Sequence, residues 1–301
     1  LRGRRVSSEC IFSQLAAWRS ILCRIGGRST VFGALLFASA ALHAEPLVLL
    51  HAIPAIEATA ESELKQSELK LLQKVMASYG DSYRVEGDVS RKRAIEILAQ
   101  DQPACIPMML KTPEREARMS FSQPYMIEEG LRLVVLTSSP WQQKLDELQK
   151  AGPISLQQLL SMDKGPIIGI DNNRSFGVKV DELLQRHAGH RAIYIRTSAL
   201  QYLDTMEPML NKKYVDIMIE YGKVAKRTPL KLSVYPFAEA DSFVMSYFSC
   251  ALTEKGQSFV AALNRAIAKS IDKSDYQQLM FEEIAPNLRP QAKQIWRRVT
   301  K

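Results

Sequence analysis

The chain has 301 residues, of which 46% are hydrophobic and 24% charged, a composition typical of globular proteins with room for one large domain or two smaller lobes. The formal charge of +8 at first suggests a nucleic-acid-binding protein, but six of the 40 basic side chains and only one of the 32 acidic ones lie in residues 1–44. The rest of the chain carries a charge of only +3, so we expect no nucleic-acid partner.

Residues 1–44 have the layout of a secretory signal. Two arginines precede an apolar run, Thr30–Leu42, and Ala44 offers a small residue for cleavage. The run is shorter than the ~20 residues that cross a bilayer as a helix, although an uncleaved anchor is the alternative. Residues 1–23 exceed what a signal needs, which fits a start codon assigned too far upstream. We therefore expect cleavage near Ala44 and a periplasmic mature protein.

After this leader, apolar runs of strand length alternate with segments of helical periodicity. Strands are predicted at 47–50, 82–86, 105–110 and 131–136, and helices at 61–79 and after the capping residue Ser90. A second alternation begins with a helix capped by Ser155. Further strands are predicted at 166–170, 191–195 and 215–219. Further helices are predicted in a segment that ends at Arg186 and at 198–210. This order predicts an α/β fold of mainly parallel sheets flanked by helices.

The last part of the chain predicts two more strands and a helical end. The strands span 231–236 and 242–248, and Thr253 begins a helix that buries one apolar face. Helical segments near 272–282 and 290–299 follow.

Two cysteines remain once the leader is removed, Cys105 and Cys250. An even pair in an oxidising compartment predicts a disulfide, with two separate buried thiols as the alternative. A disulfide requires the strand at 105–110 and the segment ending at Cys250 to be neighbours.

Arg115 follows a predicted strand and a polar turn that contains Thr112 and a proline. A guanidinium in this position can offer an anion a planar pair of donors, although a simple surface arginine is the alternative. Thr112-x-x-Arg115, followed by Phe121-Ser122-x-Pro124-Tyr125, resembles a stretch of the periplasmic solute-binding proteins of type II, family 3, which serve ABC transporters. In that family the arginine holds the carboxylate of an amino-acid-like ligand.

The resemblance implies a two-lobed fold with a ligand cleft between the lobes. The first lobe would comprise residues 45–136 and 235–301, and the second residues 137–234. Two chain crossings, near 131–140 and 230–243, would form the hinge. The carboxyl ends of the strands would line the cleft.

Three further segments are candidates for ligand binding. The turn of the second lobe reads Asn173-Arg174-Ser175-Phe176-Gly177. Its backbone N–H groups and Ser175 would bind an anion at a helix start, or the turn would act only as a helix cap. The segment Val215–Tyr221 resembles the one in which relatives present an acid to a ligand amine; the register places that acid at Tyr221, one residue after Glu220. His51, which ends the first strand, is a weaker candidate.

The sequence also departs from the family pattern. Met108 and Leu110 stand where relatives have the glycine and threonine that line the cleft, so the pocket is expected to be more apolar than one for a simple α-amino acid. Asp216 is interpreted as structural. His187 and His190 lie beside a glycine, which favours a helix end over a zinc site.

We therefore expect a binding protein without a cofactor or metal, since nucleotide-binding, metalloprotease and hydrolase fingerprints are missing from the sequence. Its partners would be a small-molecule ligand and a membrane permease or receptor in trans, and the protein would be a monomer. One alternative is a dehydratase- or lyase-like enzyme that uses Glu220, His51 or Glu128. The other is a ligand-sensing module that acts on a partner receptor.

Overall fold

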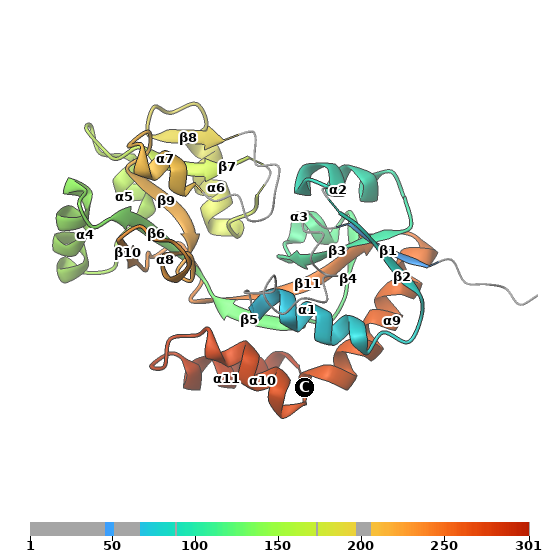
Figure 1. Cartoon of the computed structure of the whole chain (residues 1–301). Coiled ribbons are helices and arrows are strands. Elements are labelled where there is room, and N and C mark those ends of the chain that lie inside the picture. Colours follow the sequence, from blue (N-terminus) through green and yellow to red (C-terminus); the bar gives the residue numbers. More distant parts are fainter. Residues whose placement is uncertain (1–45, 51–66, 88, 173, 197–205, 301) are drawn as a thin grey trace, which may run out of the picture. The chain divides into compact units, whose positions relative to one another are not determined.

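The computed structural model describes residues 46–50, 67–87, 89–172, 174–196 and 206–300. These residues form two β-sheets, each flanked by helices (Figure 1). The α/β fold is as predicted from the alternation of strands and helices. The predicted leader, residues 1–44, lies outside the described residues.

The first sheet combines strands from the beginning and the end of the chain. Its order is β2-β1-β3-β11-β4, with β5 paired to β11. The strands are β1 (Leu47–Leu50), β2 (Tyr83–Glu86), β3 (Ala104–Met109), β4 (Met119–Phe121), β5 (Met126–Glu129) and β11 (Phe243–Ala251). The helices of this part are α1 (Ser67–Ala77), α2 (Arg91–Ala99), α3 (Pro113–Glu116), α9 (Glu254–Ile271), α10 (Ser274–Glu282) and α11 (Arg289–Val299).

The second sheet is built from the middle of the chain and has the order β10-β6-β9-β7-β8. Its strands are β6 (Leu131–Leu136), β7 (Ile168–Asp171), β8 (Ile193–Arg196), β9 (Ile217–Tyr221) and β10 (Leu232–Tyr235). The helices are α4 (Pro140–Ala151), α5 (Leu156–Leu160), α6 (Val178–Arg186), α7 (Glu207–Asn211) and α8 (Val224–Arg227).

Both sheets are mixed, whereas the sequence predicted mainly parallel ones. The βα units supply the parallel pairs of β1 with β2 and β3, and of β7 with β8 and β9. In contrast, β11 runs antiparallel to β3, β4 and β5, and β6 runs antiparallel to β9 and β10. The strands β6 and β11 each follow a passage of the chain between the sheets. They therefore enter their sheet from the end opposite to that of their neighbours.

The chain passes between the two sheets twice. The first passage is at Gly130, between β5 and β6, so the strand Leu131–Leu136 belongs to the second sheet and not to the first lobe, where the predicted boundary placed it. The second passage is the segment 236–242, between β10 and β11. The two passages are bonded to each other, because Gly130 N donates to the Ser242 carbonyl at 2.8 Å.

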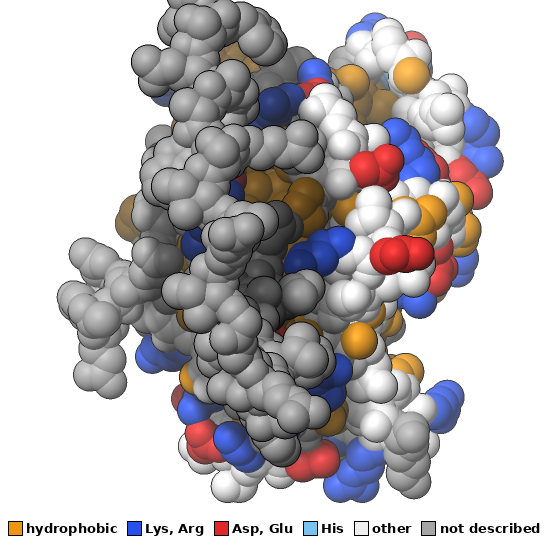
Figure 2. All heavy atoms as spheres, turned by 90° about the vertical axis from the view of Figure 1, so that its right-hand side faces the viewer, with side chains coloured by type: hydrophobic (Ala, Val, Ile, Leu, Met, Phe, Trp, Pro, Cys, Tyr) orange, Lys and Arg blue, Asp and Glu red, His pale blue; other side chains and the backbone are white. Residues whose placement is uncertain are grey.

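Each sheet has its own apolar core. In the first part, α1, α9 and α10 cover buried side chains such as Leu49, Phe248 and Leu263, and Figure 1 shows α10 near β5. In the second part, Leu133, Ile168 and other strand residues pack against apolar side chains of α4, α5 and α6. On the face shown in Figure 2, basic and acidic side chains are interspersed, which agrees with the near balance of charge outside residues 1–44.

The predicted helix starts are confirmed by their capping bonds. The Oγ of Ser90 accepts from Arg93 N at 3.3 Å, and the hydroxyls of Ser155 and Thr253 accept in the same way at the starts of α5 and α9. The predicted disulfide joins Cys105 to Cys250, which are direct partners across β3 and β11.

Candidate functional site

Arg115 lies in the short helix α3, and Thr112 is the residue that caps this helix. The Thr112 Oγ1 accepts from Arg115 N at 3.4 Å, and a proline at the first helical position suits this start. The Arg115 Nη1 donates to the Leu110 carbonyl at 3.0 Å, which fixes the direction of the half-buried guanidinium. Among the described residues, no carboxylate is hydrogen-bonded to Arg115. Its charge is therefore available to an anion.

Burial is the main influence on Arg115 and lowers its pKa, and the neighbouring Arg91 lowers it further. Asp181 acts in the opposite direction and raises the pKa of Arg115. Arg115 follows β3 of the first sheet, and Asp181 lies in α6 beside the second sheet. These two opposite charges thus lie within electrostatic reach of each other.

The remainder of the arginine motif has a structural role. Ser122 Oγ accepts from the buried Phe248 N at 3.0 Å, and Tyr125 OH accepts from Met108 N at 3.0 Å. Met108 has a φ of 56°, in the left-handed region that glycine adopts without strain. The backbone here keeps a conformation suited to glycine although the residue is methionine. The side chain of Met108 is buried.

In the second part, the predicted anion-binding turn is engaged by a carboxylate of the protein itself. The Ser175 Oγ donates to Asp181 Oδ2 at 2.6 Å, and Phe176 N donates to Asp181 Oδ1 at 2.7 Å. Gly177 caps α6 with a φ of 93°, a left-handed conformation that favours glycine. The turn thus has the predicted donors, and Asp181 accepts from them. Asn173 lies outside the described residues, as does His51.

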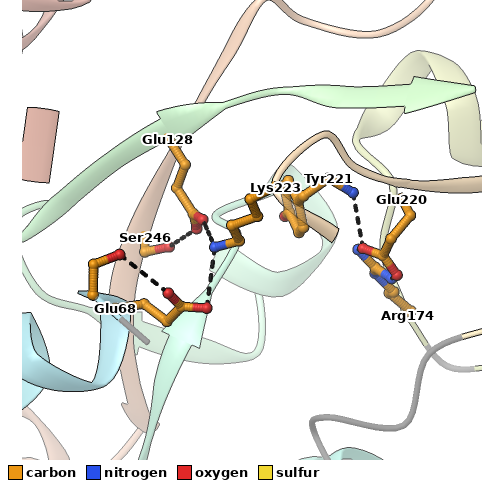
Figure 3. A network of polar contacts seen from close by, with 8 residues as sticks. Glu68, Glu128, Arg174, Glu220, Tyr221, Lys223 and Ser246 are labelled. Atoms are coloured by element: carbon orange, nitrogen blue, oxygen red, sulfur yellow. Dashed lines mark hydrogen bonds and ion pairs between the residues drawn. The ribbon is translucent and has the colours of Figure 1, made fainter. Parts of the chain in front are cut away.

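Arg174, which is partly buried, forms an ion pair with two hydrogen bonds to the buried Glu220 (Figure 3). The Arg174 Nη1 and Nη2 lie 2.6 and 2.7 Å from the two Glu220 carboxylate oxygens, and Tyr221 N donates to Oε1 at 2.9 Å. The guanidinium also lies 5.2 and 5.1 Å from the ring centroids of Phe176 and Tyr221. Burial alone would raise the pKa of Glu220, but the charge and hydrogen bonds of Arg174 outweigh it and hold the pKa below its ordinary value.

Lys223 forms a second ion-pair cluster on the other side of Tyr221 in the sequence (Figure 3). Its Nζ donates to Glu128 and lies 3.3 Å from the Glu68 carboxylate, whose side chain is only 2% exposed. Ser246 Oγ donates to Glu128 at 3.3 Å. Lys223 follows β9 of the second sheet, whereas Glu68 is in α1 and Glu128 in β5. The cluster therefore connects the two parts of the fold.

Tyr221 lies close to both clusters. Its ring centroid is 5.1 Å from the Arg174 guanidinium carbon and 5.3 Å from Lys223 Nζ. Burial raises the pKa of its hydroxyl, as does the charge of Glu128, so the hydroxyl remains protonated at neutral pH.

Sequence reasoning selected Arg115, Arg174, Glu220 and Tyr221, and electrostatic coupling links Tyr221 to each of the other three. It missed Asp181, whose position one helical turn after Gly177 was the available signal. It also missed Lys223 and Glu68, whose ion pair joins residues distant in the sequence. Asp216 is structural as interpreted, since its carboxylate accepts from Ile167 N at 2.8 Å.

Comparison with known proteins assigns the chain to a family. The family model described as bacterial extracellular solute-binding proteins, family 3, matches residues 59–282. The chain belongs to this family of solute-binding proteins. A search of the curated proteins found no match. In the part of the chain that the structure describes, none of the helices is both long and apolar enough to cross a membrane.

Solved structures of amino-acid-binding proteins share the fold at low sequence identity. The arginine-, lysine-, histidine-binding protein ArtJ from Geobacillus stearothermophilus is 16% identical, with a TM-score of 0.59 over 82% of this chain and 99% of that one. A putative L-cystine ABC transporter protein from Listeria monocytogenes is 15% identical, with a TM-score of 0.58 over 80% and 96% of the two chains. A mutant of ArgBP from T. maritima is 16% identical, with a TM-score of 0.56 over 79% and 93%.

Proposed function

We propose that this protein is an exported binding protein that captures a small, carboxylate-bearing, amino-acid-like ligand between its two lobes for an ABC transporter. The main support for this proposal is the environment of Arg115. Its guanidinium is oriented by the Leu110 carbonyl, and among the described residues no carboxylate is hydrogen-bonded to it. A guanidinium binds a carboxylate through two parallel hydrogen bonds. Family membership and the amino-acid-binding proteins of similar fold support the same class of ligand.

The lobes would close around the ligand by bending at the two passages between the sheets. We place the first passage at Gly130 and the second within 236–242, in place of the boundaries at 136 and 234 that were predicted from the sequence. Closure follows if the ligand binds both lobes together more tightly than either alone. A permease would then recognise the closed form.

The remaining parts of the proposal concern location and partners. Membership of an extracellular solute-binding family supports export, with cleavage near Ala44 and a periplasmic destination. It also supports binding without turnover of the ligand. The protein would act as a monomer that meets a membrane permease or receptor in trans.

The test is a thermal-shift screen of the purified protein against amino acids, organic acids, polyamines and short peptides. A ligand at 100 times its Kd adds ~2.7 kcal/mol of stability, which raises the melting temperature measurably. Arg115→Ala should abolish the shift, whereas the exposed Arg118→Ala, three residues further on, should retain it. An unchanged shift in Arg115→Ala would contradict the proposal.

A further inference from the structure

Four carboxylates that are at least partly buried lie around Arg115 and Tyr221, in addition to the exposed Glu114 of α3, and they differ in how their charge is balanced. They are Glu68, Glu128, Asp181 and Glu220. A ligand ammonium group needs a carboxylate that is not already neutralised by a cation of the protein. The hydrogen bonds of each carboxylate indicate which one can take this role.

Glu220 is neutralised by Arg174. Both of its oxygens accept from the guanidinium, at 2.6 and 2.7 Å, and the side chain is buried. Its charge is balanced by Arg174 and three of its about four acceptor positions are occupied, so Glu220 offers an incoming ammonium group little further stabilisation. The acid closest to the position expected from the family resemblance is therefore used inside the protein.

Glu128 and Glu68 are both engaged by Lys223. Figure 3 shows the Lys223 ammonium between the two carboxylates, with Ser246 donating to Glu128. Ser67 Oγ donates to Glu68 at 3.4 Å. The protein thus supplies its own ammonium group to these two acids. Glu128 and Glu68 are therefore not expected to bind a further ammonium group from a ligand.

Asp181 differs from the other three carboxylates. Its hydrogen bonds come from neutral groups, the Ser175 hydroxyl and the Phe176 N–H, and among the described residues no cation is hydrogen-bonded to it. An ionised carboxylate has about four acceptor positions, so each oxygen retains one for a ligand. Burial raises the pKa of Asp181, and the hydrogen bonds from Ser175 and Phe176, followed by the charge of Arg115, partly offset this effect.

We propose that Asp181 binds the ammonium group of a zwitterionic ligand whose carboxylate is held by Arg115. This inference rests on the proposed function and adds the residue that binds the amine of the ligand. Of Arg115 and these four carboxylates, only Arg115 and Asp181 make no direct bond to an opposite charge within the described part of the chain, and they come from the two different parts of the fold. A zwitterion would neutralise both charges at once, with its ammonium group at Asp181 and its carboxylate at Arg115.

The experiment measures binding of amino acids and of the matching acids that lack the amine. The pairs are L-phenylalanine with 3-phenylpropanoate, L-leucine with 4-methylpentanoate, L-glutamate with glutarate, and L-arginine with 5-guanidinopentanoate. Calorimetry of the wild-type protein should show that at least one amino acid binds about tenfold or more tightly than its partner acid. Asp181→Asn should remove this preference, with the affinity for the partner acid changed less than about threefold.

Two further variants separate the roles of the residues. Ser175→Ala removes a hydrogen bond to Asp181 but retains its charge, so the preference for the amine should persist; loss of the preference in this variant would indicate that Asp181 only shapes the turn. Arg115→Ala should abolish binding of both members of a pair. If Asp181→Asn weakens binding of both members of a pair equally, or of neither, the proposed role of Asp181 is wrong while the proposed function stands. Unchanged binding in Arg115→Ala, or no binding of any probe to the wild type, would overturn the proposed function with it.

Discussion

The guanidinium of Arg174 holds the carboxylate of Glu220 through two hydrogen bonds of 2.6 and 2.7 Å. The pair joins the turn before α6 to the end of β9, two elements 46 residues apart in the sequence. Because Glu220 is only 6% exposed, its charge depends on this partner. The pair therefore orders the turn that carries Ser175 and Phe176.

Removal of Arg174 should destabilise the protein strongly. Arg174→Met leaves the Glu220 carboxylate buried without its counter-charge, which typically costs about 3–5 kcal/mol. The double variant Arg174→Met with Glu220→Leu should recover most of this loss, because two apolar side chains need no pairing. Urea denaturation of the wild type and of both variants measures the difference. A single variant within about 1 kcal/mol of the wild type would show that the pair is not needed.

The same pair predicts how stability depends on pH. The pKa of Glu220 is lower in the folded protein than its ordinary value, so the folded state binds fewer protons there than the unfolded state. This contribution is fully present above the ordinary glutamate pKa of about 4.3 and is lost as the pH falls through the lowered folded value. Urea midpoints between about pH 6 and pH 3 should decline more steeply for the wild type than for the double variant. Parallel declines would contradict the prediction.

The parts of the fold that depend on local chemistry could be predicted from the sequence. Ser90, Ser155 and Thr253 cap helices as expected, because a hydroxyl before an amphipathic segment satisfies N–H groups a few residues away. The pairing of Cys105 with Cys250 followed from their number in a chain that was expected to be exported. In contrast, helix α4 was missed, since it buries only Leu145 and so has a weak apolar pattern.

The charge pairs of the candidate site could not be predicted in this way. Lys223 and its partner Glu128 are 95 residues apart, and the register of two different sheets decides whether they meet. The strand Leu131–Leu136 was predicted with its correct bounds but was assigned to the wrong side of a passage. An apolar strand can pair in either sheet, and in the sequence only Gly130 indicated that the chain passes from one sheet to the other at this point.

Lys223 should contribute strongly to stability because it serves two acids. Lys223→Met leaves Glu68, with 2% of its surface exposed, and Glu128 without their shared cation, and we expect a loss of about 3 kcal/mol or more in urea denaturation. The exposed Lys231→Met is the matched control and should change stability by less than about 0.5 kcal/mol. Equal effects of the two variants would show that the cluster is not important for the link between the two parts.

Gly130 should tolerate no side chain, because the two passages between the sheets meet there. A Cβ at this residue would lie 1.7 Å from the Asp241 carbonyl oxygen, and the Gly130 N–H is bonded to the Ser242 carbonyl at 2.8 Å. Gly130→Ala must therefore push the second passage away, and we expect a loss of about 2 kcal/mol or more together with weaker ligand-induced stabilisation.

Gly80→Ala is the control for this substitution, since nothing lies within 4 Å of the added Cβ and its stability should be retained or slightly increased. Thermal denaturation with and without a bound ligand measures both effects. If Gly130→Ala melts at the temperature of Gly80→Ala and binds ligand equally well, the close approach of the two passages is not required for closure.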